Sequence, residues 1–230
     1  MNDMTRPQDI DPPYAFADYR STHLRAPKQP LLQVPRALLD VHGPVVPATF
    51  VKSGDNDLTI QGRSAPLGEK IVVSGRLLDE DGRPVRRSLV EIWQANASGR
   101  YSHPGDTHQA PLDPNFHGMG RTLTDDEGRY RFVTIKPGAY PWQNHAFAWR
   151  PQHIHFSLLG NAPIQRLVTQ MYFPGDPLLP LDPIFNCVPD EKARARMVAA
   201  LALQTGIEGI ALGYTFDIVL AGSRATPLGT

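Results

Sequence analysis

Short apolar segments separated by turn-forming residues fill this sequence beyond residue 68, and they restrict its fold more than any other feature. Asp81-Gly82 follows the segment Lys70–Leu78, and Asp126-Glu127-Gly128 precedes Arg129–Ile135. Such Asp and Gly combinations are typical of tight turns between strands. The 230 residues also include 23 prolines and 19 glycines, which favour turns over long helices. The pattern therefore predicts an all-β protein.

The predicted strands and their connections indicate one β-sandwich. In Leu89–Gln94 the side chains alternate between two faces, so that Val90 and Ile92 share one of them. Residues 96–121 are typical of a long loop, and Asp190–Leu203 has the acidic start and apolar stripe of a helix. We expect a sandwich of mostly antiparallel strands with long loops and one or two short helices. The expected strands are Lys70–Leu78, Pro84–Ala95, Arg129–Ile135, His153–Leu159, Arg166–Phe173 and Tyr214–Leu220.

The first 68 residues differ from the rest because Pro, Gly and Asp interrupt them throughout. Only Pro35–Val41 is typical of a short helix there. A loop-rich segment of this length is uncommon in a compact monomer. We therefore predict an irregular N-terminal arm over residues 1–68 that contacts another subunit, followed by the sandwich domain over residues 69–230.

Charge and cysteine content exclude several classes of protein. Lys and Arg together number 23, as do Asp and Glu, so no net charge attracts nucleic acid or an anionic membrane. The single cysteine, Cys187, excludes an internal disulfide framework and an iron–sulfur cluster. No apolar stretch has the length of a membrane span, and the first residues lack the apolar core of a secretory signal. We expect a cytoplasmic protein.

The pair His153 and His155 is the sharpest local motif. Residues two apart on a strand face the same side, so both imidazoles could bind one metal ion while Ile154 points into the core. Imidazole suits Zn, Cu, Fe and Ni, so the pair does not name the ion. The alternative is two polar residues on a solvent-facing strand.

Tyrosines in Pro/Gly loops add a second kind of ligand. Tyr101 and Tyr140 both lie in such loops, and loops on a rigid scaffold often carry site residues. A phenol binds metal best when ionised, which requires a strongly acidic ion such as Fe(III). Spacing alone does not select these two over Tyr130, Tyr172 or Tyr214.

Six segments together resemble the intradiol ring-cleaving dioxygenases, and the resemblance extends from about Tyr19 to the last strand. DYRST near the N-terminus and the order of GRY, Y and HxH are most similar to beta chains of the protocatechuate-cleaving members. The segments are EIWQANASGRY (91–101), APLDPNFHGMGRTLTD (110–125), TIKPGAYPW (134–142), WRPQHIHF (149–156), LVTQMYFPGDP (167–177) and TFDIVLAG (215–222).

The resemblance implies one non-haem Fe(III) per chain. Tyr101, Tyr140, His153 and His155 match the family's iron ligands. Tyr140 matches the tyrosinate that leaves the iron when substrate binds, and is expected to act as a base for a catechol proton. Trp93 matches an aromatic residue behind the ligands.

Other matching positions are implied to act on the substrate. Arg150 is expected to stabilise negative charge on the substrate ring, with Gln170 as a second polar neighbour. Residues expected to line the substrate pocket are Tyr19, Trp142 and Ile184, together with Arg150.

The activity implied is cleavage of protocatechuate (3,4-dihydroxybenzoate) by O₂ to 3-carboxy-cis,cis-muconate, in the β-ketoadipate pathway of aromatic catabolism. Ser102, His108 and Gln143 depart from the pattern of close relatives near the site. The alternative substrates are therefore other catechols: catechol itself, hydroxyquinol or a sulfonated catechol.

A partner chain is also implied. Beta chains of this family pair with a homologous alpha chain that lacks the iron ligands, in a large hetero-oligomer. Two alternatives of other classes are a sandwich-shaped binding module without turnover and a zinc or copper enzyme that uses the two histidines.

Overall fold

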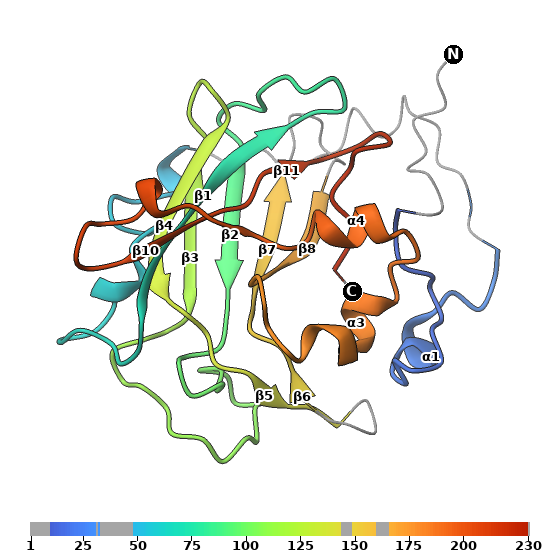
Figure 1. Cartoon of the computed structure of the whole chain (residues 1–230), viewed down its shortest axis with the longest axis horizontal. Helices are drawn as coiled ribbons and strands as arrows, with labels where there is room; N and C mark the ends of the chain where they lie inside the picture. The colour runs from blue at the N-terminus through green and yellow to red at the C-terminus, as the bar shows by residue number, and fades with distance from the viewer. Residues whose placement is uncertain (1–9, 31, 33–47, 144–148, 160–165, 230) are drawn as a thin grey trace.

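Two β-sheets packed face to face form the body of the molecule in the computed structural model (Figure 1). The structure describes residues 10–30, 32, 48–143, 149–159 and 166–229. The helix predicted at Pro35–Val41 lies outside the described residues. The described elements are predominantly strands, with few and short helices, so the predicted all-β sandwich is confirmed.

The first sheet is built around β1 (Lys70–Leu78). β4 (Arg129–Ile135) pairs with β1 in antiparallel fashion along seven residues, from Lys70↔Ile135 to Arg76↔Arg129. β10 (Leu212–Thr215) and β11 (Ile218–Val219) pair with β1 in parallel, and β9 (Ala200–Leu201) pairs with β10. The predicted strand Tyr214–Leu220 is thus divided between β10 and β11.

The second sheet is antiparallel throughout, in the order β3-β2-β7-β8. Its strands are β2 (Leu89–Trp93), β3 (Met119–Leu123), β7 (His153–Leu159) and β8 (Arg166–Tyr172). β3 begins inside the predicted loop 96–121, so that prediction was wrong at the end of the loop. The strand sequence, MGRTL, has one large apolar residue at each end and no alternation, so the pairing with β2 forms it rather than local propensity.

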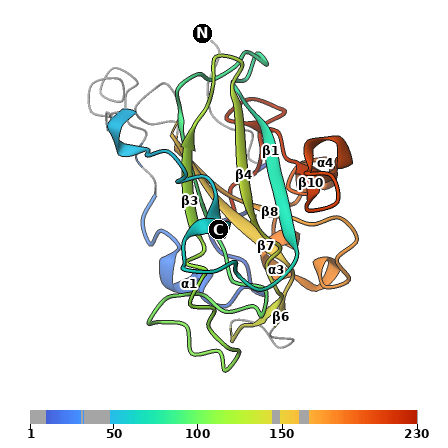
Figure 2. The ribbon, with the colours of Figure 1, turned by 90° about the vertical axis from the view of Figure 1, so that its left-hand side faces the viewer.

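Aromatic side chains from the two sheets meet in the core. The ring of Phe156 in β7 lies 5.7 Å from Tyr130 and 6.5 Å from Phe132 of β4. Val90 and Ile92 of β2 are fully buried in the same core, as the predicted alternation requires. Each such side chain contributes about 1.5–3 kcal/mol by leaving water. Figure 2 shows β3 of the second sheet set apart from β1 and β4 of the first.

The predicted hairpin at Asp81-Gly82 is only partly present. Gly82 has φ +81° in a tight turn, and Leu78 bridges Pro84, but β1 and β2 then enter different sheets. The backbone N–H of Ser88 donates to Thr124 Oγ1, at 2.9 Å, which guides the chain onto β3. The predicted strand from Pro84 therefore begins at Leu89.

The predicted helix Asp190–Leu203 is also shorter, because α4 covers only Glu191–Ala195. Beyond it the backbone of Met197 accepts from Tyr172 N–H at 2.8 Å, and Ala199 N–H donates to the Tyr172 carbonyl at 2.9 Å. Pairing with the end of β8 thus competes successfully with the helical propensity of the segment.

Short elements gather at one end of the sandwich. β5 and β6 lie at the lower end in Figure 1, with α3 beside them. No helix among the described residues is long and apolar enough to cross a membrane. The remaining elements are α1 (Thr22–Arg25), α3 (Pro183–Asn186), β5 (Tyr140–Pro141), β6 (Trp149–Arg150), and the 3₁₀ turns Ala48–Phe50, Leu58–Ile60, Leu179–Leu181 and Leu203–Thr205.

Candidate metal centre and substrate pocket

β7 places both predicted histidines on one face of the second sheet. The ring centroids of His153 and His155 are 4.8 Å apart, and Ile154 between them is fully buried in the core. His153 is itself 2% exposed. A pair of polar residues on a solvent-facing strand would not be buried in this way, so that alternative does not describe His153.

Both predicted tyrosines reach these histidines, Tyr101 from a loop and Tyr140 from the start of β5. Tyr101 Oη lies 3.0 Å from His155 Nε2, and Tyr140 Oη lies 3.3 Å from His153 Nε2. The two phenol rings are 5.4 Å apart, edge to face. The structure therefore brings together all four residues of the predicted ligand set.

Two other tyrosines that spacing could not exclude lie elsewhere. Tyr130 donates its hydroxyl hydrogen to the Phe216 carbonyl in the core. Tyr214 packs edge to face on Phe173, with centroids 5.1 Å apart. The third, Tyr172, is near His153, but its hydroxyl belongs to a different network described below.

Asn96 and two glycines hold the tyrosine-bearing segments against each other. The Asn96 carbonyl accepts from Gly99 N–H at 3.0 Å and from Gly138 N–H at 2.9 Å. Gly99 has φ +79°, and a Cβ at this position would lie 2.1 Å from the Ala139 carbonyl oxygen. Each glycine precedes its tyrosine by two residues. The close approach of the two backbone segments therefore fixes the positions of Tyr101 and Tyr140 relative to each other.

Without a cation, both imidazoles favour their uncharged form and Tyr101 favours its protonated form. His153 Nδ1 lies 2.7 Å from the Pro151 carbonyl, which can only accept, so Nδ1 carries the proton and the Nε2 lone pair faces Tyr140. Burial and the nearby Arg150 hold the pKa of His153 well below its usual range and lower that of His155 to about 3. Burial, with a contribution from Tyr140, raises the pKa of Tyr101 well above its usual value.

This donor set suits a strongly Lewis-acidic ion. Among the described residues no three His, Cys, Asp or Glu side chains converge as a metal site, so any ion bound here depends on the tyrosines. A phenol whose pKa is already raised ionises only beside a cation of high charge density. Two imidazoles and two phenols therefore fit a ferric ion better than zinc.

Trp93 supports the site from behind, as the resemblance implied. Its ring is stacked on His155, with centroids 4.7 Å apart and planes inclined by 3°. The two residues are direct neighbours across the β2–β7 ladder. The indole thus fixes the plane of the His155 imidazole.

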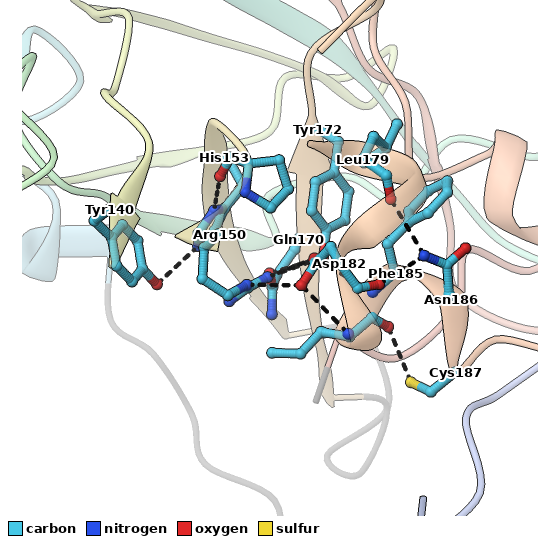
Figure 3. Close-up of polar contacts among 12 residues, drawn as sticks. Tyr140, Arg150, His153, Gln170, Tyr172, Leu179, Asp182, Phe185, Asn186 and Cys187 are labelled. Carbon is cyan, nitrogen blue, oxygen red and sulfur yellow. Dashed lines mark hydrogen bonds and ion pairs between the residues drawn. The ribbon is translucent and has the colours of Figure 1, made fainter. Parts of the chain in front are cut away.

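Arg150 lies beside Tyr140 and His153 in a buried polar network (Figure 3). Its Nη2 donates to Gln170 Oε1 at 2.6 Å and to Tyr172 Oη at 3.1 Å. Asp182 accepts from Nε at 3.0 Å and from Nη2 at 3.1 Å. Burial opposes the charge of Arg150, but Tyr172 and Asp182 outweigh it and raise the guanidinium pKa above its usual value.

Sequence reasoning missed Asp182 and Tyr172 in this network. Asp182 precedes Pro183 at the start of α3, which is a helix-start signal that could have drawn attention to it. Tyr172 lies in one of the six segments that carry the resemblance but shows no local feature that separates it from other core tyrosines.

Two of the predicted pocket residues, Tyr19 and Trp142, lie in a row with Arg150. The Tyr19 and Trp142 rings are 5.1 Å apart, edge to face, and Arg150 Cζ lies 5.4 Å from the Trp142 ring centroid. Ile184 is 3% exposed and lies two residues after Asp182. Tyr19, Trp142 and Arg150 are thus contiguous, although they come from three separate parts of the chain.

A cavity of about 540 Å³ opens against three of the four donors, but none of the predicted pocket residues Tyr19, Trp142, Arg150 and Ile184 borders it. It is bordered by Tyr101, Tyr140 and His155, and by Ser102, one of the positions that departs from the pattern. His108, another such position, lies with its ring 6.5 Å from that of Trp149 and does not border this cavity.

Comparison with protein-family models supports the resemblance over nearly the whole chain. A family described as "Dioxygenase" matches residues 41–222, and one described as "Protocatechuate 3,4-dioxygenase beta subunit N terminal" matches residues 4–37.

Individual proteins agree with these families. A protocatechuate 3,4-dioxygenase beta chain from Burkholderia cepacia is 58% identical and covers 94% of this chain and 93% of its own. An alpha chain of that enzyme from Pseudomonas putida is 31% identical over 69% of this chain and 75% of its own.

Solved structures share the fold. Catechol 1,2-dioxygenase from Acinetobacter sp. ADP1 has a TM-score of 0.54 at 26% identity, covering 74% of this chain and 59% of its own. A 3-chlorocatechol 1,2-dioxygenase from Rhodococcus opacus has a TM-score of 0.58 at 24% identity, covering 74% and 66%. The chain therefore belongs to the intradiol ring-cleaving dioxygenase family, as a relative of protocatechuate 3,4-dioxygenase beta chains.

Proposed function

We propose that this chain holds one ferric ion through Tyr101, Tyr140, His153 and His155 and cleaves protocatechuate to 3-carboxy-cis,cis-muconate. The convergence of two phenol oxygens on two imidazole Nε2 atoms, at 3.0 and 3.3 Å, is the observation that carries the proposal. The product places the reaction in aromatic catabolism, in the β-ketoadipate pathway.

The identity of the ring substituent follows from the comparisons. The relative that is 58% identical over nearly the full length is named for protocatechuate. Relatives named for hydroxyquinol and catechol are 33% and 32% identical over about half of this chain. We therefore prefer protocatechuate to the other catechols.

Ferric ion bound at this site would act as a Lewis acid that favours the ionised forms of the tyrosines and of a catechol. The role of Tyr140 is that of a base, which accepts a proton at Oη from an incoming catechol hydroxyl. Tyr140 suits this role because its hydroxyl contacts the His153 Nε2 lone pair and it borders the cavity. Tyr101 remains in place against His155.

Arg150 provides a fixed positive charge next to the reacting ring, and Gln170 keeps it in place. The guanidinium is 3% exposed, so water screens its charge little, and preorganised charge is most effective in such a dry site. Trp142 and Tyr19 exclude water and orient the ring, since their rings lie side by side next to Arg150. Ile184, which is buried on α3, is the third residue assigned to this role.

We also propose that the chain assembles with a homologous alpha chain in the cytoplasm. The 31% identical alpha chain and the N-terminal family match support the assembly, and the arm over residues 1–68 remains the predicted contact region. The single cysteine is buried and forms no disulfide, which fits a reducing compartment.

Two variants of the assembled enzyme test the ligand assignment. His155→Ala should remove bound iron and the visible colour that tyrosinate gives with ferric ion. Tyr140→Phe should keep iron, shift the absorption band and slow substrate binding. Tyr214→Phe, in the core away from the site, should change neither. Stoichiometric iron and full turnover in His155→Ala would show that the assignment is wrong.

A panel of catechols tests the substrate. Product analysis with protocatechuate, catechol, hydroxyquinol and a sulfonated catechol should show the highest kcat/KM for protocatechuate. A chain that binds iron and catechol without consuming O₂ would instead be a binding module. Zinc or copper in place of iron, found by elemental analysis of the purified protein, would favour the third alternative.

A further inference from the structure

Among the residues that the structure describes, Asp182 is a buried charged residue that the proposed mechanism does not use. It is fully inaccessible to solvent and lies at the centre of the network in Figure 3. Its two carboxylate oxygens accept from Nε and Nη2 of Arg150 at 3.0 and 3.1 Å, a two-point fork. Tyr172 Oη lies 3.1 Å from Oδ2 of the same carboxylate.

The same carboxylate begins α3. Asp182 accepts from the backbone N–H groups of Ile184 and Phe185, each at 3.4 Å, and is therefore the N-cap of this helix. Ile184 is one of the predicted pocket residues. One side chain thus connects the guanidinium of Arg150 to the element that carries an apolar pocket residue.

Arg150 is fixed in two directions by its surroundings. Asp182 holds the edge formed by Nε and Nη2, while Trp142 faces the guanidinium with its ring centroid 5.4 Å from Cζ. A free arginine side chain has several rotatable bonds, and a fork of two parallel hydrogen bonds removes much of that freedom. A charge held in one position acts on a reacting group more effectively than a mobile one.

Stability alone is a weak reason for such a pair. Both ions lose their hydration when buried, and apolar residues of similar volume often replace a buried ion pair without loss of stability. The location of the pair, between Tyr140 and His153 on one side and α3 on the other, is therefore informative (Figure 3).

We propose that Asp182 is a positioning residue of the reaction, which holds the Arg150 guanidinium in its catalytic orientation and couples it to α3, the helix that carries the predicted pocket residue Ile184. This inference rests on the proposed role of Arg150. It assigns Asp182 no contact with the substrate.

The first test is Asp182→Asn in the iron-loaded enzyme assembled with its alpha chain. Asn caps helices as well as Asp does, so α3 should keep its start while the fork loses its charge. We expect kcat per bound iron to fall about tenfold to a hundredfold, because small displacements of a catalytic group have effects of this size. KM should change less than kcat.

Asp190→Asn is the matched control. Asp190 caps α4 by accepting from Ala193 N–H at 2.6 Å, and the described contacts do not join it to Arg150. Its replacement should leave kcat unchanged. Equal kcat in Asp182→Asn and the wild type would overturn the proposal.

A double-mutant cycle separates positioning from a general effect on the fold. Arg150→Gln should lower kcat strongly, and adding Asp182→Asn should then lower it no further, because Asp182 acts only through Arg150. An undiminished loss from Asp182→Asn in the Arg150→Gln background would overturn the proposal. If Asp182→Asn does not fold, Asp182→Glu keeps the charge but displaces the carboxylate by one methylene. It should also lower kcat, and unchanged kcat in that variant would overturn the proposal equally.

A crystal structure of Asp182→Asn gives a reading that does not depend on activity. The guanidinium should leave its position facing Trp142, and an unmoved guanidinium would overturn the proposal. A wild-type enzyme that leaves protocatechuate intact would contradict the proposed function instead, and this structural reading would still decide the inference.

Discussion

The ring of Trp93 lies parallel to the imidazole of His155, with centroids 4.7 Å apart and planes inclined by 3°. This stack sets the plane in which His155 presents Nε2 to Tyr101. It is a contact between direct neighbours of two adjacent strands, so the sheet register itself aligns the His155 imidazole.

Removing the indole should therefore loosen the metal site. We expect Trp93→Ala to lower the free energy of unfolding by about 1–3 kcal/mol and to weaken iron retention, since a stacked ring pair is lost. Iron content after dialysis against a chelator and chemical unfolding measure the two effects. Trp93→Phe keeps a ring at the same place and should retain most of the iron. Equal iron retention in Trp93→Ala and the wild type would contradict this role.

A substitution at Gly99 tests the contact between the segment that carries Tyr101 and the segment that carries Tyr140. A methyl group at Gly99 would collide with the Ala139 carbonyl and would also require a positive φ from alanine. We expect Gly99→Ala to destabilise the chain by more than about 2 kcal/mol and to shift the iron absorption band, because Tyr101 and Tyr140 separate.

Gly209→Ala is the matched control for backbone strain alone. Gly209 has φ +68°, and a Cβ added there would meet no atom within 4 Å, so only the strain of positive φ remains. The substitution should cost about 1 kcal/mol and leave the spectrum unchanged. Similar losses in the two variants would show that the contact between the two segments is unimportant.

A substitution at Leu58 tests whether the N-terminal arm over residues 1–68 contributes to the core. It is fully buried, and its Cδ1 lies 2.5 Å from where a Cβ on Gly120 would stand, so it packs directly on the backbone of β3. Leu58→Ala should cost about 2–5 kcal/mol in unfolding experiments. Ile60→Ala, at a side chain that is 64% exposed, should cost less than about 1 kcal/mol. Equal losses of unfolding free energy in the two variants would show that Leu58 does not contribute to the stability of the core.

Acid should destabilise the metal-free chain through its two site histidines. The pKa of His153 is held well below its usual range, and that of His155 is lowered to about 3, by burial and by Arg150. Below about pH 6.5 the two histidines are therefore protonated in the unfolded chain but stay unprotonated in the folded chain. The free energy of unfolding consequently falls as pH decreases towards about 3.

Urea unfolding of the metal-free chain over a series of pH values checks this expectation. His155→Gln should reduce the slope of the unfolding free energy against pH between about 3 and 6.5, because one of the suppressed protonations is removed. A slope that is the same in the variant and the wild type would contradict the burial of this histidine.

Local periodicity was sufficient to predict the part of the candidate site that lies on a single strand. The strands β1, β4 and β7 begin and end at the predicted residues, and the two-residue period puts His153 and His155 on one face. Turn chemistry at Gly128 and Gly82 was also readable, because a left-handed backbone there depends on the residue itself.

Long-range pairing decided what local patterns could not. β3 exists because β2 offers it a partner, and α4 ends at Ala195 because the next residues pair with Tyr172. The predicted hairpin is only partly present and the predicted helix is shorter for this reason, since both predictions used only neighbours in sequence.

The sequence by itself determined the strand periodicity, the histidine pair and, through resemblance, the two tyrosines beside it. Only the tertiary structure placed Asp182 against Arg150, 32 residues away, and pressed Gly99 against Ala139. Side-chain periodicity is a property of the local backbone, whereas these contacts depend on how separate loops and sheets pack, which no short stretch of sequence encodes.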